Sequence, residues 1–369
     1  MKKAALLVVV LLSVLFSAPV FSLTTHAIIL VIDGARYTET LGDSTHAHVP
    51  KIAALAEQGT LLANFRTAAK GSIAEDWSGT NPGHARLTTG TYQNIKNDGT
   101  EYPSQPGVFQ QYRKQNSGPQ ESGWVICSKD KLKILANSSA PDWKDQYQPA
   151  MNCGGNGDGS GGYRADHLTH EIVKAKLLAD RPALMVINYM EPDDEGHKND
   201  WNKYLAAISA SDNYAHDLWN TIQSDSLLRD STVLFIVNDH GRHTNDFTTH
   251  GDNCEGCCKI MGVILGPDIK KGHIDSTLWE QIDVVPTIAQ LLGFAVPTAT
   301  GQVMTSIIQE TTAIKNNNVI RMVPVQNRYF LMFDEGTIKV LNQSHGNGVS
   351  NIMNVLGIRT GNVPSKSSR

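Results

Sequence analysis

The segment His26-Ala27-Ile28-Ile29-Leu30-Val31-Ile32-Asp33-Gly34 decides the fold of this chain. Its apolar run is continuous rather than alternating, which is typical of a strand buried on both faces of a sheet, and it ends abruptly at Asp33. Similar runs predict strands at 60–65, 123–127, 183–189, 232–237 and 260–265. Helical patterns alternate with them at 49–58, 106–115, 164–179, 201–224 and 278–292. This alternation predicts an α/β fold, with a mainly parallel central sheet and helices on both faces.

The composition is that of a globular protein. The chain has 369 residues, of which 40% are hydrophobic and 18% charged, and its formal net charge is −4. A chain of this length can bury a large core. Because the charge gives no basic footprint, we expect no nucleic acid as a dedicated partner. Nothing in the sequence indicates an oligomeric state.

The N-terminus has the pattern of a signal peptide. Lys2 and Lys3 precede an apolar run over residues 4–16, and small residues near Val20 and Ser22 offer a cleavage site. We predict a signal peptide at 1–22 and an exported protein, periplasmic or secreted, with no stable membrane anchor after cleavage. An uncleaved anchor is the alternative, but the run is short for a membrane span.

The mature chain is predicted to have two parts. Residues 23–315 carry the alternating strands and helices and form the main domain. Residues 316–369 form a C-terminal extension, in which 329–333 and 337–341 flank Asp334-Glu335-Gly336. That pattern predicts a small β hairpin.

Five cysteines fit an exported protein: Cys127, Cys153, Cys254, Cys257 and Cys258. The segment Cys254-Glu255-Gly256-Cys257-Cys258 suggests a zinc knuckle, but the sequence has no second cysteine pair with suitable spacing. Disulfides are therefore the favoured prediction over a cysteine metal site, and the odd number leaves one thiol over.

Three of the predicted buried strands are followed by aspartates: Asp33, Asp193 and Asp239. Because ligands of open α/β sheets sit beyond the carboxyl ends of the strands, these side chains are expected to converge on one edge. Each of them alone is more simply explained as a turn or cap residue. Their shared position favours a common site.

Three histidines accompany the aspartates. His197 lies four residues after Asp193, His240 directly follows Asp239, and His250 follows in the same loop. This mixture of oxygen and nitrogen ligands suits zinc, whereas a calcium site would be nearly all oxygen. His243 and Asp246 in that loop are weaker candidates, which could support the ligands.

The segment Thr80-Asn81-Pro82-Gly83-His84 supplies a candidate nucleophile. Thr80 stands immediately before a predicted helix, whose free N–H groups and dipole favour an anion such as a phosphoryl group. Read alone, Thr80 is more simply a helix N-cap. A pair of zinc ions roughly 4 Å apart would use all of these groups, and coordination would lower the pKa of its hydroxyl.

Taken together, these motifs resemble the alkaline phosphatase superfamily, especially its nucleotide pyrophosphatase/phosphodiesterases and its threonine-nucleophile alkaline phosphatases. The resemblance runs from Asp33 to about Pro297. It rests on five motifs: Val31-Ile32-Asp33-Gly34, Thr80-x-Pro-Gly-His84 with Thr89-Gly90, Glu191-Pro-Asp193-x-x-Gly-His197, Asn-Asp239-His240-Gly241 and Thr-His250-Gly251.

The resemblance implies two zinc ions and a division of their ligands. One ion would be held by Asp33, Thr80, Asp239 and His240, and the other by Asp193, His197 and His250. It also implies that Thr80 attacks phosphorus in line and forms a phosphothreonine, which water later hydrolyses.

Sulfatases share the fold and are the main alternative. Their motif begins with a cysteine or serine that becomes formylglycine and carries an arginine four positions later. This chain has Thr80 and His84 there, and threonine cannot become formylglycine. The resemblance therefore favours phosphate over sulfate.

Monoester and diester chemistry are both left open. The threonine-type monoesterases grip phosphate with Lys-x-Arg, and this chain has Lys129 and Lys131 at those positions. Lysine supplies charge but not the arginine fork, and the Glu-Pro-Asp193 spelling favours the diesterase branch. An asparagine that contacts phosphate is expected after Thr80, with Asn94 and Asn97 as candidates.

The sequence thus predicts an exported two-zinc hydrolase of a small-molecule phosphate ester or nucleotide. A sulfatase-like hydrolase and a non-catalytic, metal-stabilised binding protein are the alternatives.

Overall fold

The computed structural model describes residues 23–68 and 78–309, together with three short strands at 319–321, 330–333 and 338–340. Ser22–Gln309 forms one compact unit and the rest of the chain another. In the second unit, Val319–Arg321 (β12), Phe330–Phe333 (β13) and Ile338–Val340 (β14) form an antiparallel sheet. The predicted signal peptide lies outside the described residues.

The main unit is built on an eight-stranded sheet with the order β10-β2-β9-β7-β1-β6-β4-β5. Its strands are His26–Ile32 (β1), Thr60–Leu62 (β2), Gly123–Cys127 (β4), Ala150–Cys153 (β5), Leu184–Tyr189 (β6), Thr232–Val237 (β7), Gly262–Leu265 (β9) and His273–Asp275 (β10). The five adjacent strands β7, β1, β6, β4 and β5 are parallel to one another. Among the eight strands, only β9 runs antiparallel to the strands beside it. The predicted mainly parallel sheet is confirmed.

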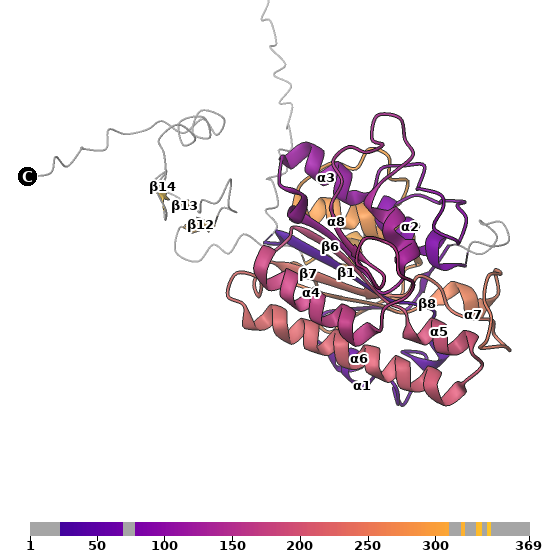
Figure 1. Cartoon of the computed structure of the whole chain (residues 1–369). Coiled ribbons are helices and arrows are strands. Elements are labelled where there is room, and N and C mark those ends of the chain that lie inside the picture. The colour runs from indigo at the N-terminus through magenta and orange to yellow at the C-terminus, as the bar shows by residue number, and fades with distance from the viewer. Residues whose placement is uncertain (1–22, 69–77, 310–318, 322–329, 334–337, 341–369) are drawn as a thin grey trace, which may run out of the picture. The chain divides into compact units, whose positions relative to one another are not determined.

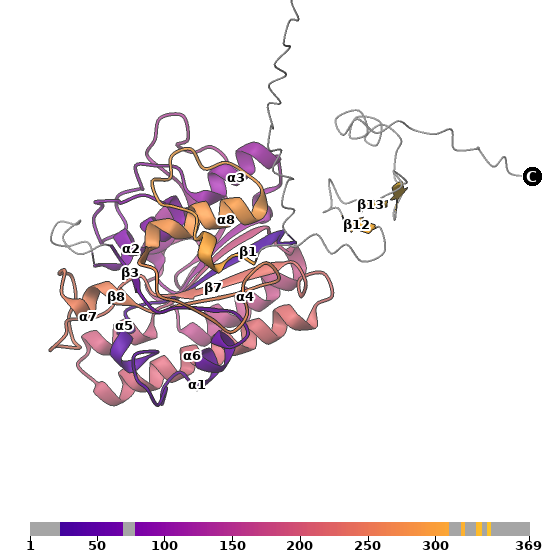
Figure 2. The same ribbon diagram turned by 180° about the vertical axis from the view of Figure 1, so that it is seen from behind.

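Helices cover both faces of this sheet (Figures 1 and 2). The helices are Pro50–Ala56 (α1), Thr80–Thr89 (α2), Val108–Asn116 (α3), Asp166–Asp180 (α4), Glu191–His197 (α5), Trp201–Ser224 (α6), Glu255–Cys258 (α7) and Val284–Leu292 (α8). One buried cluster joins Ala27, Ile29 and Val31 of β1 to α2, α3 and α8. The other joins Ile28, Leu30 and Ile32 to α1, α4 and α6. The continuous apolar run of β1 is explained, because each of its faces packs on its own helical layer.

Three predicted elements differ from the structure. The run at 60–65 predicted one strand, but it is two, β2 and Phe65–Arg66 (β3), which lie in different sheets. The pattern at 278–292 predicted one helix, but Trp279–Glu280 is a strand (β11) that pairs with Phe65–Arg66 (β3), and α8 begins only at Val284. The run at 260–265 is two strands, Lys259–Ile260 (β8) and β9, because the Met261 amide donates to the Asn238 side chain (2.9 Å) instead of to a neighbouring strand. In the last two places a tertiary partner outweighs the local pattern.

All five cysteines are free thiols, so the disulfides favoured by the sequence are not formed in this structure. Cys127 and Cys153 are register neighbours on β4 and β5, and both are buried. Among the described residues, no helix has the length and apolarity to cross a membrane.

Candidate active site

Four adjacent parallel strands bring the candidate residues to one edge of the sheet. In the order β7, β1, β6 and β4, these strands end just before Asp239, Asp33, Asp193 and Lys129. Their registers align the ends, since Ile32 pairs with Tyr189 and Cys127 with Asn188. Parallel strands share the edge at which their carboxyl ends lie, so three carboxylates and one ammonium converge there.

Thr80 begins helix α2 at this edge. The N-cap is Gly79, which has extended backbone angles, and the Thr80 hydroxyl does not cap the helix. Interpreting Thr80 as a plain N-cap is therefore wrong. Its Oγ1 is buried 3.5 Å from an Asp33 carboxylate oxygen and 3.1 Å from Nζ of Lys129. The hydroxyl thus faces the carboxylates.

The sequence of α2 reflects this position, because all ten of its residues are buried although few are apolar. Thr88 and Thr89 satisfy their hydroxyls by donating to carbonyls one turn back, at 2.8 and 2.7 Å. The Arg86 Nε donates to Gln281 at 2.8 Å. Internal hydrogen bonds therefore allow this polar helix to be buried, and the buried helix positions Thr80.

Asp193, His197 and His250 form one group of potential metal ligands. Nε2 of His197 lies 3.3 Å from Asp193 and 3.1 Å from Nε2 of His250. The other nitrogen of His250 contacts the Ser78 carbonyl at 2.7 Å, which orients the ring. Two imidazole nitrogens that face one another beside a carboxylate suit a shared cation.

A second group overlaps the first and surrounds Thr80. Asp33 lies with Asp193 and His240, and also with His84 and Asp239. The Asp239 Oδ2 and His240 Nε2 atoms are buried without a hydrogen bond in the described structure, although Asp239 Oδ2 lies 3.3 Å from His84 Nδ1 and 3.4 Å from His240 Nε2. Buried polar atoms left in this way fit a bound ion. Together these groups contain six of the seven ligands assigned from the sequence, and the seventh, Thr80, lies beside Asp33.

Lys129 lies among these groups. Its Nζ is 2.6 Å from Asp193, 3.0 Å from Asp33 and 3.1 Å from Thr80 Oγ1. Burial by itself would raise the pKa of Asp33, but the Lys129 ammonium and His240 outweigh it and hold that pKa well below its usual range. The same balance of burial against Lys129 lowers the pKa of Asp193. The carboxylates are therefore charged and available as ligands at neutral pH.

Lys131 and Asn97 form a pair at the start of α2. Asn97 Oδ1 accepts the Asn81 backbone N–H at 2.8 Å, and Lys131 Nζ donates to the Asn97 carbonyl at 3.0 Å. Burial and the neighbouring Lys129 ammonium lower the pKa of Lys131 to about 8. Both asparagines are exposed, but in the described structure no hydrogen bond joins Asn94 to this group. The structure therefore favours Asn97 of the two asparagines.

The sequence alone did not predict a role for three buried residues that lie at the site. Arg242 donates to Asp193 Oδ1 at 2.6 Å, and Asn188 donates to Asp33 at 2.9 Å. His84 Nδ1 lies 2.8 Å from the Thr80 carbonyl and 3.3 Å from Asp239. The sequence could have indicated Asn188, because it is a lone polar residue within an apolar strand. The sequence pattern does not predict that Arg242 is buried.

Two glycines allow the edge to close. Gly34 has a φ of +65°, and a side chain there would come within 2.7 Å of Asp193 Oδ1. A Cβ at Gly83 would lie 2.4 Å from the Asp239 carbonyl oxygen. Only glycine meets both demands at Gly34, the positive φ and the close approach.

Comparisons with known proteins agree with this geometry. The model of the family described as "Sulfatase" matches residues 25–294. No curated protein sequence matches the chain.

Solved structures of related fold come from several hydrolases. A phosphonate monoester hydrolase of Silicibacter pomeroyi is 13% identical with a TM-score of 0.51, covering 84% of this chain and 86% of that one. A Bacteroides thetaiotaomicron sulfatase from a glycosaminoglycan locus is 12% identical with a TM-score of 0.58, covering 91% and 94%. A Vibrio parahaemolyticus protein of the alkaline phosphatase superfamily is 13% identical with a TM-score of 0.53, covering 89% and 84%. At these identities the likeness shows the fold.

The family match and the fold identify the chain as a hydrolase of the alkaline phosphatase superfamily. Within that superfamily, the chain belongs to the sulfatase family.

Proposed function

We propose that this hydrolase cleaves phosphate esters with Thr80 as its nucleophile and two zinc ions as cofactors. The observation that carries the proposal is the placement of the buried Thr80 hydroxyl between Asp33 and Lys129, at the first residue of α2. A hydroxyl that only stabilised the helix would point to its own backbone N–H groups.

Threonine supports phosphate rather than sulfate as the substrate. The family is named for sulfatases, and the solved neighbours include both a sulfatase and a phosphonate monoester hydrolase. Conversion to formylglycine requires cysteine or serine, and Thr80 has neither side chain. His84 stands where the sulfatase motif has arginine, and here it contacts Asp239.

The donor set supports two cations. Asp33, Thr80, Asp239 and His240 would hold one, and Asp193, His197 and His250 the other. Three imidazoles among three carboxylates favour zinc over calcium. When bound, the two ions supply charge that acidifies the Thr80 hydroxyl and stabilises the attacking and leaving oxygens.

The residues of the chain then perform a double displacement. The Thr80 hydroxyl releases its proton to solvent, Oγ1 forms a bond to phosphorus while the bond to the leaving oxygen breaks, and that oxygen is protonated from solvent. Water next attacks phosphorus, which breaks the Thr80 ester and restores the hydroxyl. Lys129 donates toward Oγ1 at 3.1 Å, so its ammonium can stabilise the alkoxide and a non-bridging phosphate oxygen.

Substrate selectivity is proposed to depend on Lys131 and Asn97. A monoester carries one more negative charge than a diester near neutral pH, and Lys131 offers a single cationic point instead of an arginine fork. That single contact is better matched to a diester. We accordingly propose a phosphodiester or nucleotide substrate, with a monoester as the second candidate.

A substrate panel tests the proposal. Chromogenic phosphate monoester, phosphate diester and sulfate ester are compared as kcat/KM for the wild type, Thr80→Ala and Thr80→Ser, with zinc measured by elemental analysis. We expect diester turnover with two active-site zinc ions, partial activity in Thr80→Ser and loss in Thr80→Ala. Sulfate-ester turnover at the highest kcat/KM, or full phosphate-ester activity in Thr80→Ala, would contradict it.

The cellular location remains part of the proposal. The basic and apolar segment at residues 1–22 supports export. Fractionation of cells that produce the full-length chain should place the activity outside the cytoplasm, with a mature N-terminus near Leu23.

A further inference from the structure

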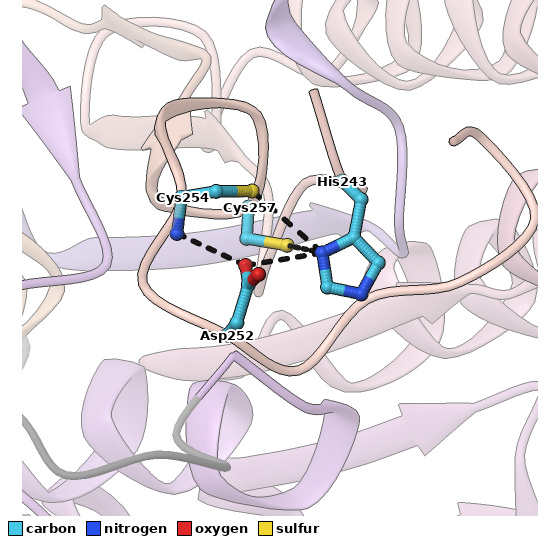
Figure 3. A group of neighbouring side chains, drawn as sticks. All are labelled: His243, Asp252, Cys254 and Cys257. Atoms are coloured by element: carbon cyan, nitrogen blue, oxygen red, sulfur yellow. Dashed lines mark hydrogen bonds and ion pairs between the residues drawn. The ribbon is translucent and has the colours of Figure 1, made fainter. Parts of the chain in front are cut away.

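A second cluster of metal-ligand side chains lies in the loop between β7 and β8. His243, Asp252, Cys254 and Cys257 turn toward one another (Figure 3). The His243 Nδ1 atom is 3.0 Å from Asp252 Oδ1, 3.4 Å from Cys257 Sγ and 3.7 Å from Cys254 Sγ. One ligand atom from each residue lies within 4.8 Å of all the others.

Hydrogen bonding accounts for only part of this arrangement, in which Asp252 Oδ1 accepts the Cys254 backbone N–H at 2.9 Å. An imidazole Nδ1 carries either one proton or one lone pair, so it can make one good hydrogen bond. Here a carboxylate and two sulfur atoms surround the same nitrogen. Groups gathered around one point in this way fit an ion at their centre.

The distances suit tetrahedral zinc. With Zn–N and Zn–O bonds of about 2.0 Å and Zn–S bonds of about 2.3 Å, the edges of a tetrahedron are roughly 3.3 to 3.8 Å. The two sulfur–nitrogen distances, 3.4 and 3.7 Å, fall in this range, and the oxygen–nitrogen distance of 3.0 Å is slightly shorter. Small shifts of the exposed Asp252 side chain would complete the geometry.

We propose that His243, Asp252, Cys254 and Cys257 bind a structural zinc ion, separate from the site at Thr80. Four protein ligands close the coordination shell, which is typical of structural zinc sites, and the two sulfur ligands favour zinc over calcium or magnesium. On binding, each thiol releases its proton to solvent and becomes a thiolate. The knuckle-like Cys-x-x-Cys thus finds its other two ligands in a histidine and an aspartate.

The position of the cluster gives the ion a structural role. The Gly241 amide donates to the Cys257 carbonyl at 2.9 Å, and the Arg242 amide donates to Gly256 at 3.0 Å. His250 lies inside the loop that His243 and Cys257 close. An ion at the cluster would thus hold together the segment that presents Arg242 and His250 to the active site.

Cobalt(II) provides a test that does not depend on activity. Metal-free full-length protein, prepared with a chelator under reducing conditions, is reloaded with Co²⁺. We expect near-ultraviolet absorption from thiolate-to-cobalt charge transfer, which the histidine and aspartate ligands of the active site cannot produce. The absorption should be lost in Cys254→Ser and Cys257→Ser. It should persist in His197→Ala, so that failure at this site and failure of the proposed function are distinguishable.

Cys258→Ser is the matched control, because Cys258 is the neighbouring cysteine in α7 and lies outside the cluster. It should keep the absorption and the extra equivalent of zinc found in the purified wild type. A wild type without the absorption would overturn the proposal, whether or not the variants fold. So would a Cys254–Cys257 disulfide in the purified protein, found by mass spectrometry without reduction.

Discussion

At the scale of single residues, Thr80 has the clearest consequence. Its hydroxyl is the proposed nucleophile, so Thr80→Ala should lower kcat/KM for phosphate esters by about 10³-fold or more. Thr80→Ser keeps a hydroxyl at the same backbone position and should retain part of the activity. Steady-state kinetics check this, with circular dichroism to establish that both variants fold. Equal losses in the two variants would indicate a packing role for Thr80.

His197 tests one half of the metal centre. The ring lies 3.1 Å from His250 and 3.3 Å from Asp193, and it is half-exposed, so its removal should not disturb the core. His197→Ala should lose one equivalent of active-site metal and about two orders of magnitude in kcat, because a bound cation contributes several kcal/mol to the transition state. His216→Ala, on helix α6 and outside the groups of potential metal ligands, is the control. Unchanged metal content and kinetics would remove His197 from the site.

Lys131 predicts a pH dependence. Since its pKa is lowered to about 8, its ammonium is charged below that pH and neutral above it. If Lys131 attracts the anionic substrate, KM should rise as the pH passes upward through about 8. Lys131→Arg should keep KM low at higher pH, since arginine stays charged. Lys133→Arg, in the same 3-10 helix Asp130–Ala136, should behave like the wild type. A pH profile of KM identical in all three proteins would contradict the assignment.

What the sequence could predict at this scale was local. Asp33, Asp193 and Asp239 directly follow apolar strands or lie one turn beyond them. The sequence pattern therefore predicted that they lie at one edge of the sheet. The choice between Asn94 and Asn97 was not, because it depends on which side chain reaches the Asn81 amide. The ligand set at His243 was missed for a similar reason, since it forms only when the loop folds back on itself.

At the scale of elements, Asp166 connects two parts of the active site. The buried carboxylate accepts the Ser128 hydroxyl at 2.6 Å and the backbone N–H groups of Met190 and Glu191 at 2.8 and 2.9 Å. It therefore ties the segment that carries Lys129 to the start of α5, which carries Asp193. Asp166→Ala leaves those buried donors without a partner, at a cost of about 1–3 kcal/mol for each.

We expect a lower Tm and a lower kcat for Asp166→Ala, measured by thermal unfolding and steady-state assay. Asp180→Ala, at the exposed end of the same helix α4, is the comparison, because within the described part of the chain Asp180 accepts a side-chain hydrogen bond only from Trp124. A normal kcat in an Asp166→Ala protein of lowered stability would show that the tie serves the fold alone.

Elements were predicted best where one local cause dominates. Trp201–Ser224 and Thr232–Val237 have the predicted bounds, because their apolar periodicity is uninterrupted. The strand at Trp279 was mistaken for helix because its conformation depends on pairing with Phe65, far away in sequence. Local patterns do not contain that information.

At the scale of the whole molecule, the metal centre is part of the stability of the fold. Asp33, Asp193 and Asp239 are buried close together at the edge of the central sheet, where Lys129 pairs with Asp33 and Asp193 and Arg242 pairs with Asp193. Removing the ions with a chelator should lower Tm by several degrees, because repulsion among the carboxylates is then less compensated. Zinc should restore Tm and calcium should not.

The Cys257→Ser variant isolates this effect from the second cluster, and it should still lose stability with the chelator. A Tm that does not change when zinc is shown to leave would contradict a contribution of the active-site ions to folding. The sheet itself was predictable at this scale, since alternating strands and helices allow few arrangements. The surfaces against which each loop packs were not predictable from the sequence.

The central claim is that Thr80 forms a covalent bond to phosphorus during turnover. The most direct measurement is rapid acid quench of the enzyme with a chromogenic phosphate ester, followed by tandem mass spectrometry of the peptide that contains Thr80. We predict a phosphoryl or phosphoester adduct on the Thr80 oxygen, which accumulates during turnover and is absent from Thr80→Ala. An active enzyme whose quenched Thr80 peptide is unmodified, together with undiminished turnover by Thr80→Ala, would contradict the claim.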